Sequence, residues 1–407
     1  MKFIEGGVCA AKGFQAAGIH VGVKTHADWK KDVALIVSET PCAAAGVFTR
    51  NVVKAAPVHV DLAHLRNGTA RAIIANSGNA NACAPHGEAY AERMCAAAAD
   101  VIGCAPDDVL VSSTGVIGQT LNIEAIEGGV RELYHALAST PEASDAAAHA
   151  IMTTDTVKKE AAVETLIDGK TVRIGGIAKG SGMIHPNMGT MLCFLTTDCA
   201  ISPAMIRAAL LETADVSFHR ISVDGDTSTN DSCMVLANGL AGNAEIAAEG
   251  PDYAAFLDAL QALCIGLARE MASDGEGAKH LITCTVSGAK SVKSAETVAK
   301  SVISSTLMKA AIFGADANWG RALCAMGYSG ETFDPDKVNV SFASAAGEIP
   351  VCSNGRGLDF DEDRAKKILS EHDVEIRISM GEGNAACTCW GCDITYDYIK
   401  INGDYRT

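Results

Sequence analysis

A threonine after a glycine-rich loop is the most reactive arrangement that the sequence offers. Residues 175–198 read GGIAKGSGMIHPNMGTMLCFLTTD, and Thr190 stands where this loop meets a short apolar run, residues 191–195, with the length of a buried strand. The Thr190 hydroxyl could attack the Gly189 carbonyl and shift the acyl group from nitrogen to oxygen, leaving an ester that water cuts. The product would be an N-terminal threonine whose α-amine, with a reference pKa of about 8, is a general base for its own hydroxyl. From spacing alone, an ordinary threonine opening a strand is the alternative.

Seven short motifs occur along the chain. In order, they are NSGNANAC (76–83), SSTGVIG (112–118), MTTDT (152–156), AKGSGMIHPNMGTML (178–192), DGEGA (274–278), NWGR (318–321) and KINGDYRT (400–407). In the second motif, which follows a short expected strand, the Thr114 hydroxyl and the Gly115 amide could point at a developing oxyanion. A serine/threonine turn is the alternative for that motif.

Together these motifs make the chain similar to the ornithine acetyltransferase (glutamate N-acetyltransferase) family of arginine biosynthesis, and the match runs from the first residues to the last. The resemblance implies self-cleavage before Thr190. It then implies ping-pong transfer of the acetyl group from N2-acetyl-L-ornithine to L-glutamate through an acetyl-Thr190 intermediate. Whether acetyl-CoA also serves as donor stays open. The family often has alanine before the nucleophile, and Gly189 at that place should ease cleavage sterically.

The resemblance also implies roles for individual residues. Thr190 is the nucleophile, cleavage falls between Gly189 and Thr190, and Thr114 and Gly115 are the oxyanion donors. Substrate contacts are implied at Thr153, Lys179, Thr190, Glu276, Asn402 and Thr407. Lys179 is a candidate partner for a substrate carboxylate, although an ordinary surface lysine is an equal alternative. Glu276 lies in an expected loop between a helix and a strand, where it could hold an ammonium group or assist proton transfer.

No cofactor and no metal are expected. Moving an acetyl group between two α-amines exchanges one amide for a similar one, so a covalent ester suffices. Cys387, Cys389 and Cys392 lack the fourth ligand of a closed zinc site, and residues 223–232 (VDGDTSTNDS) lack the glycine and glutamate positions of a calcium loop and are expected to form a turn. Lys179 is not preceded by the glycine of a phosphate-binding loop, and no GxSxG or HExxH motif occurs.

The composition limits the kinds of partner and the compartment that we expect for this protein. The 407 residues are 48% hydrophobic and carry a net charge of −16, which disfavours nucleic acid and anionic lipid as partners. An anionic substrate such as glutamate therefore needs locally placed donors. The N-terminus has no signal-peptide pattern, and no apolar run approaches the length of a membrane helix. The 15 scattered cysteines are expected to be free thiols in a reducing cytoplasm.

The expected elements alternate between helices and strands. Residues 33–37 and 43–48 are predicted to be paired strands joined by a turn around Pro41, and residues 161–177 a hairpin turned at Asp168 and Gly169. Further strands are expected at 70–75, 109–111 and 281–286. Helices are expected at 85–101, 122–137, 142–152, 203–214, 253–271, 295–309 and 361–370.

The resemblance supplies the fold class and the chain organisation. It implies an α/β protein of N-terminal-nucleophile type, with stacked β-sheets sandwiched between helices in an αββα-like order. Segments 1–189 and 190–407 are expected to stay together after cleavage and to share one core. Two such pairs are expected to form a heterotetramer.

Two rival functions stay open. The first is an amidohydrolase or aminopeptidase with the same N-terminal threonine, in which water takes the acyl group. The second is an uncut, non-catalytic protein that binds a small molecule.

Overall fold

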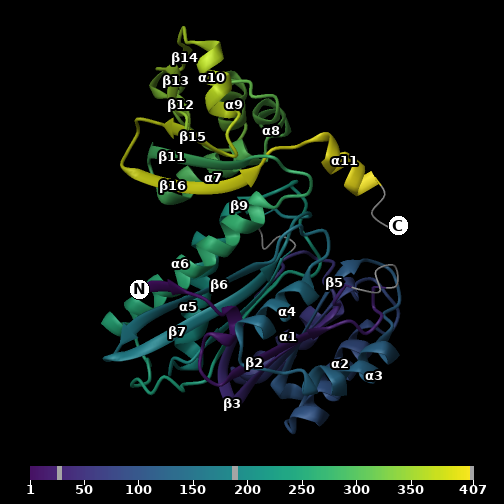
Figure 1. Ribbon diagram of the computed structural model, residues 1–407. Coiled ribbons are helices and arrows are strands. Elements are labelled where there is room, and N and C mark those ends of the chain that lie inside the picture. The colour runs from purple at the N-terminus through teal and green to yellow at the C-terminus, as the bar shows by residue number, and fades with distance from the viewer. Residues whose placement is uncertain (25–29, 186–190, 404–407) are drawn as a thin grey trace.

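The computed structural model describes residues 1–24, 30–185 and 191–403. Within these ranges the chain forms two units, a larger one on a nine-stranded sheet and a smaller one on a seven-stranded sheet (Figure 1). No helix in the described ranges is long and apolar enough to cross a membrane.

The larger sheet has the strand order β1-β6-β7-β8-β10-β3-β4-β5, and β2 pairs with β3. The strands are β1 (Lys2–Ile4), β2 (Phe14–Ile19), β3 (Val33–Phe48), β4 (Thr69–Asn79), β5 (Val109–Val116), β6 (Lys159–Ile167), β7 (Lys170–Lys179), β8 (Leu192–Thr197) and β10 (Ser232–Ala237). Strand β3 belongs to both halves, because its first part pairs with β2 and β4 and its second part with β10.

Helices cover both halves of this sheet. Helices α5 (Pro203–Val216) and α6 (Pro251–Ser273) share a core with β6, β7, β8 and β10, whereas α2 (Gly87–Ile102) and α3 (Ile123–His135) share one with β2 to β5. Helix α1 (Ala56–His64) packs beside β5. Helix α4 (Pro141–Ile151) contacts β2, β3 and β4 from one half and also β6 and β7 from the other, so the sheet halves face a common interior. The expected class of stacked sheets between helices is confirmed.

The prediction of two strands joined at Pro41 was wrong, because residues 33–48 form one continuous strand. The pairing register of β3 with β4 shifts between Val37 and Cys42. Pro41 therefore lies in an irregularity where pairing with β4 does not need the backbone N–H that proline lacks. The apolar runs on either side belong to one long strand that exchanges partners. The predicted hairpin at Asp168 and Gly169 is confirmed, with φ of 49° and 69° at the two turn residues.

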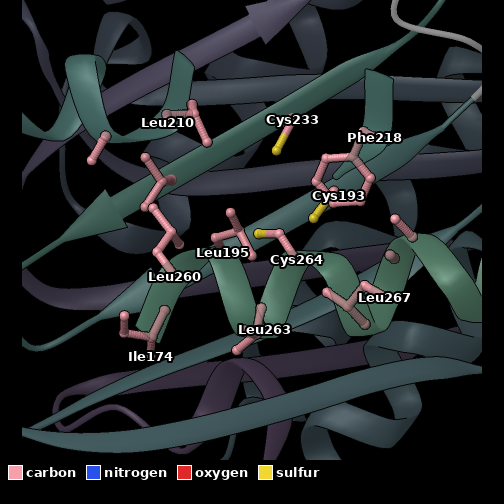
Figure 2. Close-up of a cluster of buried hydrophobic side chains, with 14 of the residues drawn as sticks. Ile174, Cys193, Leu195, Leu210, Phe218, Cys233, Leu260, Leu263, Cys264 and Leu267 are labelled. Carbon is pink, nitrogen blue, oxygen red and sulfur yellow. The ribbon is translucent and has the colours of Figure 1, made fainter. Parts of the chain in front are cut away.

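Strand β8 lies between β7 and β10, so residues from both sides of position 190 build one sheet. Figure 2 shows the core at this strand, where Leu195 from β8, Ile174 from β7, and Leu260 and Leu263 from α6 belong to one buried cluster. The apolar stripe of α6, formed by Phe256, Leu260, Leu263 and Leu267, is buried, and each such side chain contributes roughly 1.5–3 kcal/mol on burial. A cut before residue 190 would therefore leave two segments that share a core.

The smaller unit has the strand order β14-β13-β12-β15-β11-β16-β9. Its strands are β9 (Ile221–Ser222), β11 (Leu281–Ala289), β12 (Asn339–Ser344), β13 (Gly347–Ser353), β14 (Arg356–Gly357), β15 (Asp373–Ser379) and β16 (Ala385–Cys392). Its helices are α7 (Val292–Ser304), α8 (Thr306–Phe313), α9 (Trp319–Gly327) and α10 (Glu362–Leu369). Its buried cluster draws only on residues 282–389. The last helix, α11 (Tyr396–Gly403), follows this unit.

The single helix predicted over 295–309 was wrong, because the chain forms α7 and α8 there. Ser305 separates them in an extended conformation, and its side chain accepts a hydrogen bond from the Met308 amide as the N-cap of α8. The helix predicted over 361–370 is confirmed as α10.

Candidate active site

One pocket of about 240 Å³ gathers six of the residues that the sequence analysis singled out. Thr114, Gly115, Thr153, Lys179, Glu276 and Asn402 all line it, together with Val116, Ile117, Thr154, Gly182, Met183, Ser228, Thr229 and Asn230. Gly189, Thr190 and Thr407 lie outside the described residues. The six come from five separate segments between residue 114 and residue 402.

The end of β5 forms the wall that carries Thr114 and Gly115. Gly115 has φ of +132°, and a Cβ there would lie 2.4 Å from the carbonyl carbon of Gly78 on β4, so only glycine fits this close approach. The two strands pair up to this point and then shift register between Gly78 and Asn79. The strand predicted over 70–75 proves longer, because β4 continues to Asn79 through its parallel pairing with β5.

Lys179 ends β7 and is 2% exposed, so it is not a surface lysine. Its Nζ donates to Thr153 Oγ1 at 2.7 Å and lies 3.7 Å from Asp155 Oδ2. Burial lowers the pKa of Lys179, and the nearby charge of Asp155 acts in the opposite direction. An ammonium group has three donors, so the hydrogen bond to Thr153 leaves donors that can meet a ligand carboxylate.

Glu276 reaches the pocket from the loop after α6 and is buried. Its Oε2 accepts a hydrogen bond from Asn402 Nδ2 on α11 at 2.7 Å, and its backbone amide donates to the Ser181 carbonyl at 2.8 Å. A Cβ on Gly182 would lie 2.3 Å from that Oε2, so glycine makes room for the carboxylate. Because the partner is a neutral amide, this contact does not neutralise the charge of Glu276.

A buried cluster of charged side chains contacts Lys179 and Thr153. Lys159 Nζ lies 2.7 Å from Asp155 Oδ1 and 2.6 Å from Asp274 Oδ2, and its side chain has no exposed surface. Asp155 also accepts the amides of Gly180, at 2.7 Å, and Thr153, at 3.1 Å. Burial alone would raise the pKa of Asp155, but the charges of Lys179 and Lys159 outweigh burial and hold that pKa well below its usual range.

Sequence reasoning missed this cluster as part of the site. Asp155 and Asp274 stand inside two of the seven motifs, MTTDT and DGEGA, and that was the available signal. Lys159 lies outside every motif, so its position between the two acids could not be anticipated from spacing.

Sequence reasoning also missed the segment from Ser228 to Asn230, which it interpreted only as a turn. These residues line the pocket although they belong to a polar run. Asn230 Nδ2 donates to the Ser113 carbonyl at 2.8 Å and to the Ala80 carbonyl at 2.6 Å. The signal was a run of polar side chains directly before the apolar strand β10, where Ser228 to Asp231 prove to be buried.

The cysteines form no disulfides within the described ranges, and all 15 are free thiols, most of them buried. Cys387, Cys389 and Cys392 lie on β16 in the smaller sheet. Among the described residues, no group of three or more histidine, cysteine or acidic side chains is placed to hold a metal ion.

The pocket therefore combines three kinds of groups. Lys179 offers a cation, Glu276 offers an anion, and Thr114 with Gly115 offers a hydroxyl and an amide at the end of a strand. A small molecule that carries both a carboxylate and an amine complements the two charges. The hydroxyl and amide are of the type that stabilises the oxyanion in acyl transfer.

The sequence pattern of the ArgJ family matches residues 15–407. The arginine biosynthesis bifunctional protein ArgJ of Symbiobacterium thermophilum is 50% identical over 408 residues, covering 100% of both chains. The protein of the same name from Thermotoga neapolitana is 48% identical over 399 residues, covering 97% of this chain and 99% of the relative. A solved ornithine acetyltransferase from Mycobacterium tuberculosis, complexed with ornithine, is 40% identical. The match covers 47% of this chain and 99% of the solved chain, with a TM-score of 0.43.

Proposed function

The chain belongs to the ArgJ family and is an acetyltransferase of arginine biosynthesis, and we propose that its pocket moves the acetyl group of N2-acetyl-L-ornithine to L-glutamate through an ester on Thr190. In the first half-reaction the Thr190 hydroxyl attacks the acetyl carbonyl, the amide C–N bond breaks, and the α-amine of ornithine leaves with a proton. In the second, the α-amine of glutamate attacks the ester and frees the hydroxyl. The N-terminal amine of Thr190 carries the proton between these steps.

The proposal gives a role to each of the six predicted residues that line the pocket. Thr114 and Gly115 stabilise the oxyanion of both tetrahedral intermediates. Lys179 and Thr153 hold the α-carboxylate that both substrates share. Glu276, oriented by Asn402, faces the amine side, and Thr407 completes the substrate contacts. The single observation that supports the proposal most is that six residues implied by the family motifs line one pocket, although they are up to 288 positions apart in the sequence (402 − 114).

A paired assay tests the reaction. With N-acetylornithine and glutamate present, we expect equal amounts of N-acetylglutamate and ornithine, and we expect little acetate when glutamate is left out. Acetate release at the same rate with and without glutamate would contradict the transferase and favour the amidohydrolase. No turnover in either mixture, by an intact uncut chain, would favour the binding protein.

Replacing Lys179 with methionine should raise the KM for both substrates by about 10- to 100-fold, because a hydrogen bond to a charged group contributes roughly 1.5–3 kcal/mol. The kcat should change less. Because burial lowers the pKa of Lys179, its charge is lost at a lower pH than for an exposed lysine, so the KM of the unmodified enzyme should rise as the pH climbs toward 10. Steady-state kinetics across pH checks both expectations.

Lys170 provides the matched control, since it is exposed at the other end of β7. Lys170→Met should leave both KM values within about twofold, as expected for a surface position. An effect of Lys179→Met on one substrate alone would contradict the assignment of a shared carboxylate.

The proposal extends to chain processing and assembly. Cleavage gives segments 1–189 and 190–407, two such pairs form a heterotetramer, and the enzyme works in the cytoplasm. Denaturing electrophoresis and the mass of the native particle check the first two statements. The relatives' names include the word bifunctional, so we also propose acetyl-CoA as a second donor. Release of CoA that depends on glutamate is the readout.

A further inference from the structure

We propose that Asn230 and Asp231 are paired positioning residues that set the distance between the nucleophile and the oxyanion corner. The inference rests on the proposed function, because it assumes that Thr190 and Thr114 act on one acyl group. It assigns a role to two adjacent side chains that hold different strands of the site.

Asp231 holds Met191, the residue that links Thr190 to strand β8. Its side chain is fully buried, and Oδ1 accepts the backbone N–H of Met191 at 2.9 Å. The Met191 nitrogen is bonded to the carbonyl carbon of Thr190, so this contact lies at the peptide that carries the proposed nucleophile. The backbone amide of Ser232 donates to the Met191 carbonyl at 3.0 Å. Met191 is thus held at both its nitrogen and its oxygen by two consecutive residues.

Asn230 holds the strand that carries Thr114. Its Nδ2 donates to the Ser113 carbonyl at 2.8 Å, and that carbonyl belongs to the peptide directly before Thr114. A second bond, to the Ala80 carbonyl at 2.6 Å, reaches the segment that follows β4. The amide oxygen of Asn230 is fixed in turn by the Thr229 hydroxyl at 2.5 Å.

Two neighbouring side chains therefore connect the peptide after the proposed nucleophile with the peptide before the proposed oxyanion donor. Since reacting groups must be placed to within about 1 Å, a rigid link of this kind affects the rate of acyl transfer more than the binding of substrate. A loss of either link should lower kcat and leave KM nearly unchanged.

The buried environment of Asp231 also affects the charge of its carboxyl. Its Oδ2 is buried and has no hydrogen-bond partner within the described ranges. The neighbouring Thr49 hydroxyl donates instead to the Ser228 carbonyl, at 2.7 Å. Burial raises the pKa of this carboxyl well above its usual value. An uncharged carboxyl is a much less costly buried group than a carboxylate, which makes it suited to a positioning role.

The chain offers a close structural match for Asp231 away from the proposed nucleophile. Asp61 on α1 is also fully buried, accepts one strand amide, that of Val111, at 2.8 Å, and has an unpartnered Oδ2 among the described residues. Burial raises its pKa in the same way. Asp61 contacts β5 three residues before Thr114, and it does not line the pocket. A purely structural role would make the two aspartates equivalent.

The test compares Asp231→Ala, Asp231→Asn and Asp61→Ala. We expect Asp231→Ala to lower kcat about 100-fold, with KM within about threefold. We expect Asp61→Ala to lower the thermal midpoint similarly but to keep kcat within about threefold. Asp231→Asn can still accept the Met191 amide and should recover most of the lost rate. Equal losses of kcat in both alanine variants, or an unchanged kcat in Asp231→Ala, would overturn the inference.

The time course of self-cleavage is the second readout, and it needs no substrate. It should slow in Asp231→Ala, recover in Asp231→Asn and stay normal in Asp61→Ala. If the unmodified protein cleaves itself but transfers no acetyl group to glutamate, the proposed function fails while these cleavage rates still test the positioning role. If cleavage is equally fast in all variants and kcat is too, the positioning role fails while the proposed function stands.

Discussion

Thr190→Ala protein should remain a single uncut chain and should lose acetyl transfer by about 10⁴-fold or more, the range seen when a covalent nucleophile is removed. The reason is that one residue supplies the attacking oxygen for cleavage and, after cleavage, both the nucleophile and its base. Without the hydroxyl, neither the ester of the cleavage step nor the acetyl ester can form. Denaturing electrophoresis and the paired assay measure the two losses on the same preparation.

Thr190→Ser is the matched variant, because it keeps the hydroxyl and removes only a methyl group. We expect it to be cleaved and to retain measurable transfer, with N-terminal sequencing of the 190–407 segment giving serine followed by Met191. Processing of Thr190→Ala at the normal rate, together with normal transfer, would contradict the covalent mechanism.

Local features of the fold followed from the sequence wherever a few neighbouring residues determine the backbone. The Asp168-Gly169 pair supports a tight hairpin because both residues tolerate positive φ. The stripe on α6 repeats every three to four residues, and all of it is buried. The position of Pro41 was misread, since proline is compatible both with a turn and with an irregularity inside a strand.

The parts of the site that spacing could not supply depend on contacts between distant segments. Lys159 and Asp274 are 115 positions apart, and their ion pair exists only because β6 begins beside the end of α6. Asn230 contacts Ser113 across 117 positions. The family motifs identified most of the pocket, but periodicity and turn signals alone would have left Lys179 as an ordinary lysine and residues 228–230 as a turn.

Lys159→Met should destabilise the protein by about 3–5 kcal/mol at pH 7, because it leaves Asp155 and Asp274 buried without the cation that bridges them. This is a large share of the roughly 5–15 kcal/mol that stabilises a typical domain. Asp155 also fixes the amides of Thr153 and Gly180 on either side of the pocket lysine, so transfer activity should fall as well. Urea unfolding followed by circular dichroism measures the change in the free energy of unfolding.

The pH dependence of the stability lost in Lys159→Met distinguishes lost charge pairing from lost packing. In the unmodified protein the pKa of Asp155 lies below its usual value, so its contribution to stability is present above about pH 4 and is lost as the pH falls through the lowered pKa. In Lys159→Met the stranded Asp155 carboxyl should bind a proton more readily than in the unfolded chain, so the loss of stability should shrink between pH 7 and pH 5. The neighbouring Lys158 pairs with Asp145 and Glu160 at the surface, and Lys158→Met should cost less than about 1 kcal/mol. A deficit for Lys159→Met that is equal at both pH values would show that the methylene packing of this lysine, rather than its charge, stabilises the site.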